Sequence, residues 1–165
     1  MGKRLYLIRH AKSSWSDSSL RDIDRPLNKR GLRDAPFMAK LLRGKGARPD
    51  ALVSSPARRA YATARFFAEA FAVPADAVHQ RERLYEASWY DVQAVVRDFA
   101  PAWTSVCLFG HNPTFTAVAN QFYDDYLPNL PTCGIVRIDL AIDDWSGFDA
   151  RSGRVKDIHY PKEYL

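Results

Sequence analysis

Residues 5–17 read LYLIRHAKSSWSD, an apolar run that leads directly into an arginine and a histidine. The run is typical of a buried strand, which we expect at residues 4–8. A cation and an imidazole at the end of such a strand add nothing to a hydrophobic core, because an unpaired buried charge is unfavourable. Arg9 and His10 are therefore candidate functional residues, provided that the rest of the chain supplies partners for them.

The composition indicates a single globular domain, which we expect to span residues 1–165. Of the 165 residues, 47% are hydrophobic and 13% aromatic, and the net charge is +5. Basic residues are scattered among acidic ones, so we expect a mild preference for anionic partners and no nucleic-acid partner.

Cysteine content and hydropathy indicate the cellular compartment in which we expect the protein. Cys107 and Cys133 lack the spacing of a zinc site or a disulfide framework, so we expect a reducing compartment and no metal. The first apolar run is too short for a signal peptide, and none approaches the roughly 20 residues of a membrane span. We therefore expect a cytoplasmic protein with no membrane partner.

Strand-like and helix-like segments alternate, which indicates an α/β fold with a largely parallel central sheet. Apolar residues at helical spacing predict the helices, and Pro36 should kink or shorten the first of them. From residue 144 onward the pattern predicts only a hairpin or loop. Strands are expected at residues 4–8, 51–54, 106–109 and 135–140, with a short one within 77–81, and helices near residues 28–43, 60–71, 92–99 and 115–122.

The second expected strand also ends in a basic segment. Residues 52–63 read LVSSPARRAYAT. Here we expect Ser55 as the N-cap of a helix and Pro56 at its first position, which places Arg58 and Arg59 in the first turn. Cations at a helix N-terminus oppose the helix dipole, so an anion should compensate them.

A histidine follows the third expected strand. Residues 106–115 read VCLFGHNPTF, in which Asn112 should cap a helix that Pro113 opens, directly after His111. The carboxyl ends of parallel strands line one crevice, so the three junctions should bring two arginines and two histidines together. With the donors of the helix N-termini, such a pocket suits a dianion, and phosphate is the obvious candidate.

These residue types also suggest a reaction. Arginine binds phosphate oxygens through a planar pair of donors. A histidine beside several cations stays neutral and keeps its lone pair, so it can attack phosphorus while the cations stabilise the phosphoryl oxygens. The expected intermediate is a phosphohistidine that water hydrolyses, with no metal and no cofactor.

Four segments resemble the motifs of one family, in the same order along the chain. LIRHAKSSWS (residues 7–16) is similar to the R-H-G-x-S-x-W-N segment of the histidine phosphatase superfamily, which has the phosphoglycerate mutase-like fold. RPLNKRG (25–31) resembles its R-P-L-T-x-x-G stretch. SSPARRAYAT (54–63) and FGHNP (109–113) resemble its S-S-P-x-x-R-A-x-x-T and G-H-x-x motifs. The resemblance implies a three-layer α/β sandwich with a largely parallel central sheet.

The resemblance also implies roles for single residues. His10 corresponds to the phosphorylated nucleophile, and Arg9 and Arg59 to the two arginines that bind phosphate. His111 corresponds to the second catalytic histidine. Glu86, in RLYEAS, lies where many members carry an acidic proton donor, although a surface or helix-capping carboxylate is an equal alternative.

Three positions are less clear from the resemblance. Arg58 is either a surface residue or part of the rim that contacts substrate. Ser16 stands where mutase-type members have a phosphate-binding asparagine, so that contact becomes a hydroxyl or is lost. Ala11 replaces the usual glycine, which removes some backbone freedom.

The short chain resembles the compact SixA-type phosphohistidine phosphatases. Little chain separates Glu86 from Gly110, which leaves no room for the insertions that cover the site in mutases and acid phosphatases. The resemblance thus implies an open site and a phosphate-bearing substrate, either a phosphohistidine protein or another phosphorylated protein side chain. Alternatives are a small-molecule phosphomonoesterase, a phosphoglycerate mutase-like phosphotransferase and, last, a non-catalytic phosphate-binding module.

Overall fold

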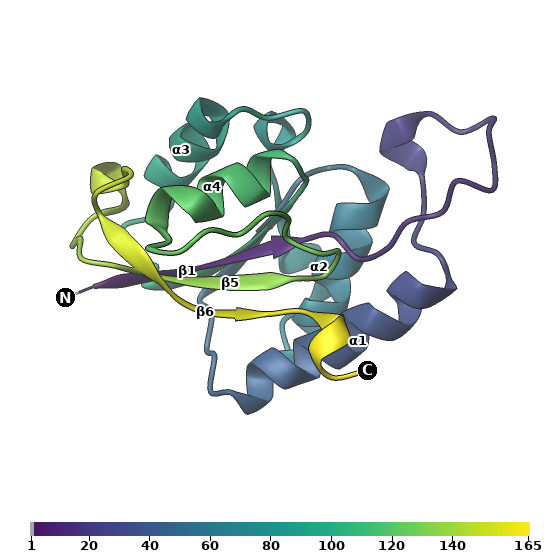
Figure 1. The fold of residues 1–165 in the computed structure, drawn as a ribbon, viewed down its shortest axis with the longest axis horizontal. Coiled ribbons are helices and arrows are strands. Elements are labelled where there is room, and N and C mark those ends of the chain that lie inside the picture. The colour runs from purple at the N-terminus through teal and green to yellow at the C-terminus, as the bar shows by residue number, and fades with distance from the viewer. Residues whose placement is uncertain (1) are drawn as a thin grey trace.

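The computed structural model describes residues 2–165, which form a six-stranded sheet with helices on both faces (Figure 1). The strand order is β3-β2-β4-β1-β5-β6. The pairs β3·β2, β2·β4 and β4·β1 are parallel, whereas β5 and β6 extend the sheet with antiparallel pairing. The strands are β1 (Lys3–Arg9), β2 (Ala51–Ser54), β3 (His79–Gln80), β4 (Ser105–Gly110), β5 (Ile135–Leu140) and β6 (Gly153–His159).

Alternation of side chains along the central strands creates two cores. Leu5 and Leu7 of β1 face one side and pack in a cluster with residues of α3 and α4. Tyr6 and Ile8 face the other side and pack with residues of α1 and α2. The predicted three-layer sandwich is therefore confirmed, with α3 and α4 on one face of the sheet and α1 and α2 on the other. Figure 1 shows α3 and α4 above the sheet and α1 below it. The helices are α1 (Lys29–Gly44), α2 (Arg58–Ala70), α3 (Trp89–Arg97) and α4 (Thr114–Phe122).

Each expected strand and helix is present, and most differ from the prediction only by one or two residues at their ends. The region after residue 144 contains β6, which pairs with β5 as a hairpin. Helix α1 continues past Pro36 for its full length, so the expected shortening is wrong. Burial of Ala35, Met38 and Ala39 against the sheet holds the helix together around the missing N–H donor.

Two helix starts differ from the prediction. Helix α2 begins at Arg58 after Ala57, and α4 begins at Thr114 after Pro113, so the expected N-caps at Ser55 and Asn112 are wrong. The Ser55 hydroxyl accepts a hydrogen bond from the Ala57 N–H, which keeps this segment out of the helix.

The side chain of Asn112 still serves α4, although it is not the N-cap. Its Oδ1 accepts from the Thr116 N–H at 3.0 Å. One of the donors that a helix N-terminus leaves free is thereby satisfied.

Close packing explains why the last residue of RPLNKRG is a glycine. Gly31 lies in the first turn of α1, and a Cβ built on it would lie 2.2 Å from the Lys12 carbonyl oxygen. That carbonyl also accepts from the Asn28 N–H, and the Asn28 side chain caps the helix by accepting from the Gly31 N–H. The start of α1 thus packs against the backbone two residues after His10.

Gly31→Ala should destabilise the protein by about 1–3 kcal/mol, because the clash is with backbone that cannot move aside. Gly44→Ala in the same helix is the matched control. A Cβ there meets nothing within 4 Å, so the change should be neutral or slightly stabilising. Urea denaturation of both variants measures the difference, and equal stabilities would contradict this packing.

Candidate active site

Three neighbouring strands end at the same level of the sheet, and the candidate site lies where they end. Arg9 of β1 pairs with Gly110 of β4, and the His10 N–H donates to the Gly110 carbonyl at 3.0 Å. On the other side of β4, the Ser55 N–H donates to the Phe109 carbonyl at 3.0 Å. The residues that directly follow β1, β4 and β2 therefore lie side by side.

His10 is held in one tautomer. Its Nδ1 lies 2.7 Å from the Ala11 carbonyl oxygen, which can only accept, so Nδ1 carries the proton. Nε2 keeps its lone pair and forms no hydrogen bond within residues 2–165, although the residue is only 7% exposed. The Ala11 N–H donates to the Thr63 hydroxyl at 3.0 Å, which fixes the carbonyl that orients the ring.

His111 faces His10, with the two ring centroids 5.3 Å apart. Its Nε2 lies 2.8 Å from the Ser55 Oγ, while its Nδ1 is buried with no hydrogen-bond partner in the described part of the chain. Ser55 is thus a part of the site that sequence reasoning interpreted as a helix cap.

The two predicted arginines contribute further free donors. The Arg9 Nη1 donates to the Leu130 carbonyl at 2.9 Å, and within the described chain its Nε is buried without a partner. The Arg59 terminal nitrogens are hydrogen-bonded to Asp22, and its Nε is likewise buried without a partner among residues 2–165. Unpaired buried donors are rare and unfavourable, so these two N–H groups are positioned for an acceptor.

Burial and neighbouring cations keep both histidines neutral. Burial is the main cause that lowers the pKa of His10 to about 3; the hydrogen bond to the Ala11 carbonyl opposes the shift, and the positive charges of Arg59 and Arg9 act in the same direction as burial. For His111, burial and then Arg59 lower the pKa to about 4, although Asp22 opposes the shift. The His10 lone pair is therefore available at neutral pH.

Glu86 lies at the edge of the site. It follows η3 (Glu82–Leu84) and Tyr85 with a φ of 54°, is exposed, and forms no hydrogen bond or ion pair within residues 2–165. The N-cap of α3 is Ser88, which forms a capping box with Asp91, so Glu86 does not cap this helix. Its role as a proton donor stays a prediction.

Arg58 and Ser16 are both exposed. Arg58 lies in the first turn of α2, where its side chain forms no hydrogen bond within the described chain. Ser16 lies in the segment between β1 and α1, with its Oγ 2.8 Å from the Ser14 Oγ. Neither is hydrogen-bonded to the histidines or arginines of the site, and their roles in substrate binding stay predictions.

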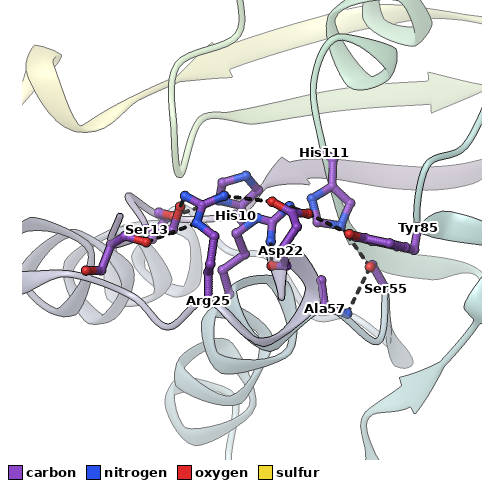
Figure 2. A network of polar contacts seen from close by, with 11 residues as sticks. His10, Ser13, Asp22, Arg25, Ser55, Ala57, Tyr85 and His111 are labelled. Atoms are coloured by element: carbon purple, nitrogen blue, oxygen red, sulfur yellow. Dashed lines mark hydrogen bonds and ion pairs between the residues drawn. The ribbon is translucent and has the colours of Figure 1, made fainter. Parts of the chain in front are cut away.

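Sequence reasoning missed two further residues of the polar network in Figure 2. The Asp22 carboxylate binds Arg59 and accepts from the Tyr85 hydroxyl at 2.5 Å. The Tyr85 ring packs edge-on against His111, with the centroids 5.7 Å apart. Asp22 lies three residues before the RPLNKRG motif and Tyr85 directly before Glu86, and this proximity to motif residues was the available signal.

Other kinds of site find little support in the described part of the chain. No group of three or more His, Cys, Asp or Glu side chains within residues 2–165 is arranged to hold a metal ion. Cys107 and Cys133 are free and buried, and burial raises the pKa of both thiols. Among these residues, no helix is long and apolar enough to cross a bilayer.

Comparison with known proteins agrees with this geometry. The model of the histidine phosphatase superfamily (branch 1) matches residues 5–117, a segment that contains both histidines and both arginines. The chain belongs to this superfamily. It is also 30% identical over 161 residues to an uncharacterised chloroplastic protein of Arabidopsis thaliana, which covers 93% of this chain and 73% of that protein.

Solved structures identify the type of histidine phosphatase that this chain resembles. The crystal structure of the "putative phosphohistidine phosphatase SixA" from Agrobacterium tumefaciens has a TM-score of 0.80 and 29% identity, over 98% of this chain and 99% of that one. The protein histidine phosphatase SixA complexed with tungstate shares the fold, with a TM-score of 0.78 and 20% identity over 98% of this chain and 99% of that one. This superfamily member is therefore a histidine phosphatase of the SixA type.

The lowered pKa values predict how this phosphatase responds to acid. In ¹⁵N spectra of histidine-labelled protein, His10 and His111 should stay neutral from pH 8 to pH 5, with the proton of His10 on Nδ1. The unfolded chain takes up protons near the ordinary pKa of 6.5, whereas the folded histidines do not. Stability should therefore fall as the pH decreases from about 6.5, and it should fall less in His10→Gln. An imidazolium signal from either residue above pH 5 would contradict this interpretation.

Proposed function

We propose that this histidine phosphatase is metal-independent, uses His10 as its nucleophile, and acts on phosphohistidine or other phosphorylated protein side chains. One observation carries the proposal: within residues 2–165, the free Nε2 of His10 is accompanied by three buried nitrogens without hydrogen-bond partners. Two are the Nε atoms of Arg9 and Arg59, and the third is the Nδ1 of His111. A phosphoryl group offers one oxygen to each.

In the first step, the Nε2 lone pair of His10 attacks phosphorus in line with the leaving group. The bond from phosphorus to the leaving nitrogen or oxygen breaks, and its electron pair goes to that atom, which takes up a proton from water or from Glu86. The phosphoryl group is then bonded to Nε2, while Nδ1 keeps its proton on the Ala11 carbonyl. The ring is cationic at this stage and is a good leaving group.

In the second step, water attacks the phosphohistidine. A new bond forms from the water oxygen to phosphorus, and the bond to Nε2 breaks, returning its electron pair to the imidazole. Inorganic phosphate and a proton are released, and His10 is again neutral. Apart from the substrate, water and a proton taken up in the first step and released in the second, both steps balance with side chains alone.

The other residues stabilise the charge on the transferring group. The Arg9 and Arg59 guanidiniums bind equatorial phosphoryl oxygens. We assign the Ser55 hydroxyl as a donor to the His111 Nε2, since it accepts from the Ala57 N–H and, within residues 2–165, forms no other hydrogen bond that could take its own proton. The His111 proton then lies on Nδ1, and this N–H can donate a hydrogen bond to the phosphoryl group.

The similarity to SixA-type structures supports a phosphohistidine-bearing polypeptide as the substrate. The exposure of Glu86 is consistent with this choice, because an imidazole leaves more easily than an alkoxide and depends less on a general acid. A small-molecule phosphomonoesterase or a mutase-like phosphotransferase would depend more strongly on a general acid.

His10→Ala should abolish phosphate release from a phosphohistidine peptide in EDTA, and Arg59→Ala should lower kcat by roughly 10²–10³-fold through loss of an electrostatic contact. A rapid-quench experiment should trap a labelled, acid-labile phosphoryl group in the wild type but not in His10→Ala. His159→Ala is the control, because this histidine lies on β6 beside Tyr164. Turnover by His10→Ala at the wild-type rate would refute the mechanism.

Glu86→Gln should separate the substrate classes. If the natural leaving group is imidazole, the variant should retain most of its activity on a phosphohistidine peptide and lose about 10²-fold or more on an alkyl phosphate. Glu82→Gln, another exposed carboxylate in the preceding turn, is the matched control. Equal losses of activity on both substrates would mean that Glu86 acts whatever the leaving group is. That result would favour ordinary phosphate esters as the natural substrates.

A further inference from the structure

The Asp22 carboxylate joins three basic or polar side chains from separate parts of the chain. Its Oδ2 accepts from the Arg59 Nη2 at 3.0 Å and from the Tyr85 hydroxyl at 2.5 Å. Its Oδ1 accepts from the Arg25 Nη1 at 2.9 Å. Its backbone carbonyl accepts from the Arg59 Nη1 at 2.7 Å, so the same residue binds both terminal nitrogens of Arg59.

Figure 2 shows Asp22 between Arg25 on one side and Tyr85 on the other, next to His10 and His111. Asp22 opens the short turn η1 (Asp22–Asp24) in the segment that follows β1 and projects beyond the sheet in Figure 1. No part of the mechanism above uses this residue.

The hydrogen bonds to Asp22 leave the phosphate-binding edge of Arg59 free. A guanidinium has five N–H groups, and Asp22 takes one from each terminal nitrogen. The buried Nε–H and one N–H on each terminal nitrogen remain. Arg59 can therefore bind Asp22 and a phosphoryl oxygen at the same time through different edges.

We propose that Asp22 is a positioning residue, which holds the Arg59 guanidinium in the plane and orientation needed to bind the transferring phosphoryl group. This inference rests on the proposed function, because it assigns Asp22 a role toward the same phosphate. Asp22 does not touch the substrate and acts through Arg59.

Asp22 is itself firmly held. Arg25, which is buried, donates from Nη2 to the Ser13 hydroxyl at 2.6 Å and from Nε to the Ser14 carbonyl at 3.0 Å. The Trp15 ring covers the same guanidinium, with its centroid 3.2 Å from the Arg25 Cζ. The segment between β1 and η1 thus folds around Arg25 and presents Asp22 to Arg59.

The charge of Asp22 also suits this role. Arg9 and Arg59 lie close enough that the charge of Arg59, together with burial, lowers the pKa of Arg9. Hydrogen bonds from Tyr85, Arg25 and Arg59 hold the pKa of Asp22 well below its ordinary value, so the carboxylate stays ionised. An anion at this point offsets the repulsion between the two guanidiniums before phosphate arrives.

The same contacts admit an opposite function, in which Asp22 competes with phosphate for Arg59. The two functions predict opposite signs for phosphate affinity. If Asp22 positions Arg59, removing its charge should weaken phosphate binding. If Asp22 competes, removing its charge should tighten binding.

Isothermal titration with inorganic phosphate distinguishes these signs in the full chain. For Asp22→Asn we expect the Kd for phosphate to rise and kcat/KM to fall, each by roughly 10- to 100-fold, as for loss of a hydrogen bond to a charged group. Asp24→Asn is the matched control, because Asp24 lies in the same turn and, among residues 2–165, its side chain pairs only with the exposed Arg21. A Kd for Asp22→Asn at or below the wild-type value would overturn the inference.

A double-mutant cycle tests whether Asp22 acts through Arg59. Asp22→Asn should have little further effect in the Arg59→Ala background, whereas full additivity of the two effects would contradict a positioning role. The ¹H–¹⁵N signal of the Arg59 Nε–H, assigned by its absence in Arg59→Ala, should be sharp in the wild type and broadened in Asp22→Asn. An unchanged signal would also count against the inference.

The Arg59→Ala variant separates failure of this inference from failure of the proposed function. If Arg59→Ala leaves phosphate affinity unchanged, the phosphate site itself is wrongly assigned. If Arg59→Ala weakens phosphate binding and Asp22→Asn does not, only the role of Asp22 is wrong.

Discussion

The alignment of three strand ends is the constraint on which the site depends. Because β2, β4 and β1 are adjacent and parallel, the residues after them leave the sheet at the same level. Two backbone hydrogen bonds, from His10 to Gly110 and from Ser55 to Phe109, extend this register into the site itself. A shift of one residue between β1 and β4 would turn His10 or His111 away from the other, and a shift between β2 and β4 would move Ser55 away from His111, because successive side chains point to opposite faces.

This arrangement concentrates positive charge in a place where water is scarce. Burial of Arg9 and Arg59 without a full set of partners is unfavourable, and the neutral state of both histidines follows from the same burial. Asp22 and the Leu130 carbonyl supply part of the compensation, and a bound dianion would supply the rest. The free protein therefore carries a local instability that suits a phosphate site and that no purely structural role would require.

Much of the fold followed from simple patterns. The buried strands are short apolar runs, and the helices between them repeat apolar residues with a period near 3.6. In α4 the buried residues at this spacing are Phe115, Val118, Ala119 and Phe122. Helix starts were harder, since Ser55 has the chemistry of an N-cap but uses its hydroxyl for Ala57 and His111. A side chain with two uses cannot be assigned from local sequence alone.

The part of the site that could not be predicted consists of contacts between distant segments. His10 and Arg59 belong to motifs whose spacing reflects strand-to-helix junctions, and junctions can be located from hydrophobic patterns. Asp22 lies in an irregular segment, and its partners Arg59 and Tyr85 are 37 and 63 residues away. Loops carry no periodic signal that fixes which side chains meet. The residues expected to perform the chemistry can therefore be predicted from the sequence. The residues that orient them can be identified only from the three-dimensional structure of the loops.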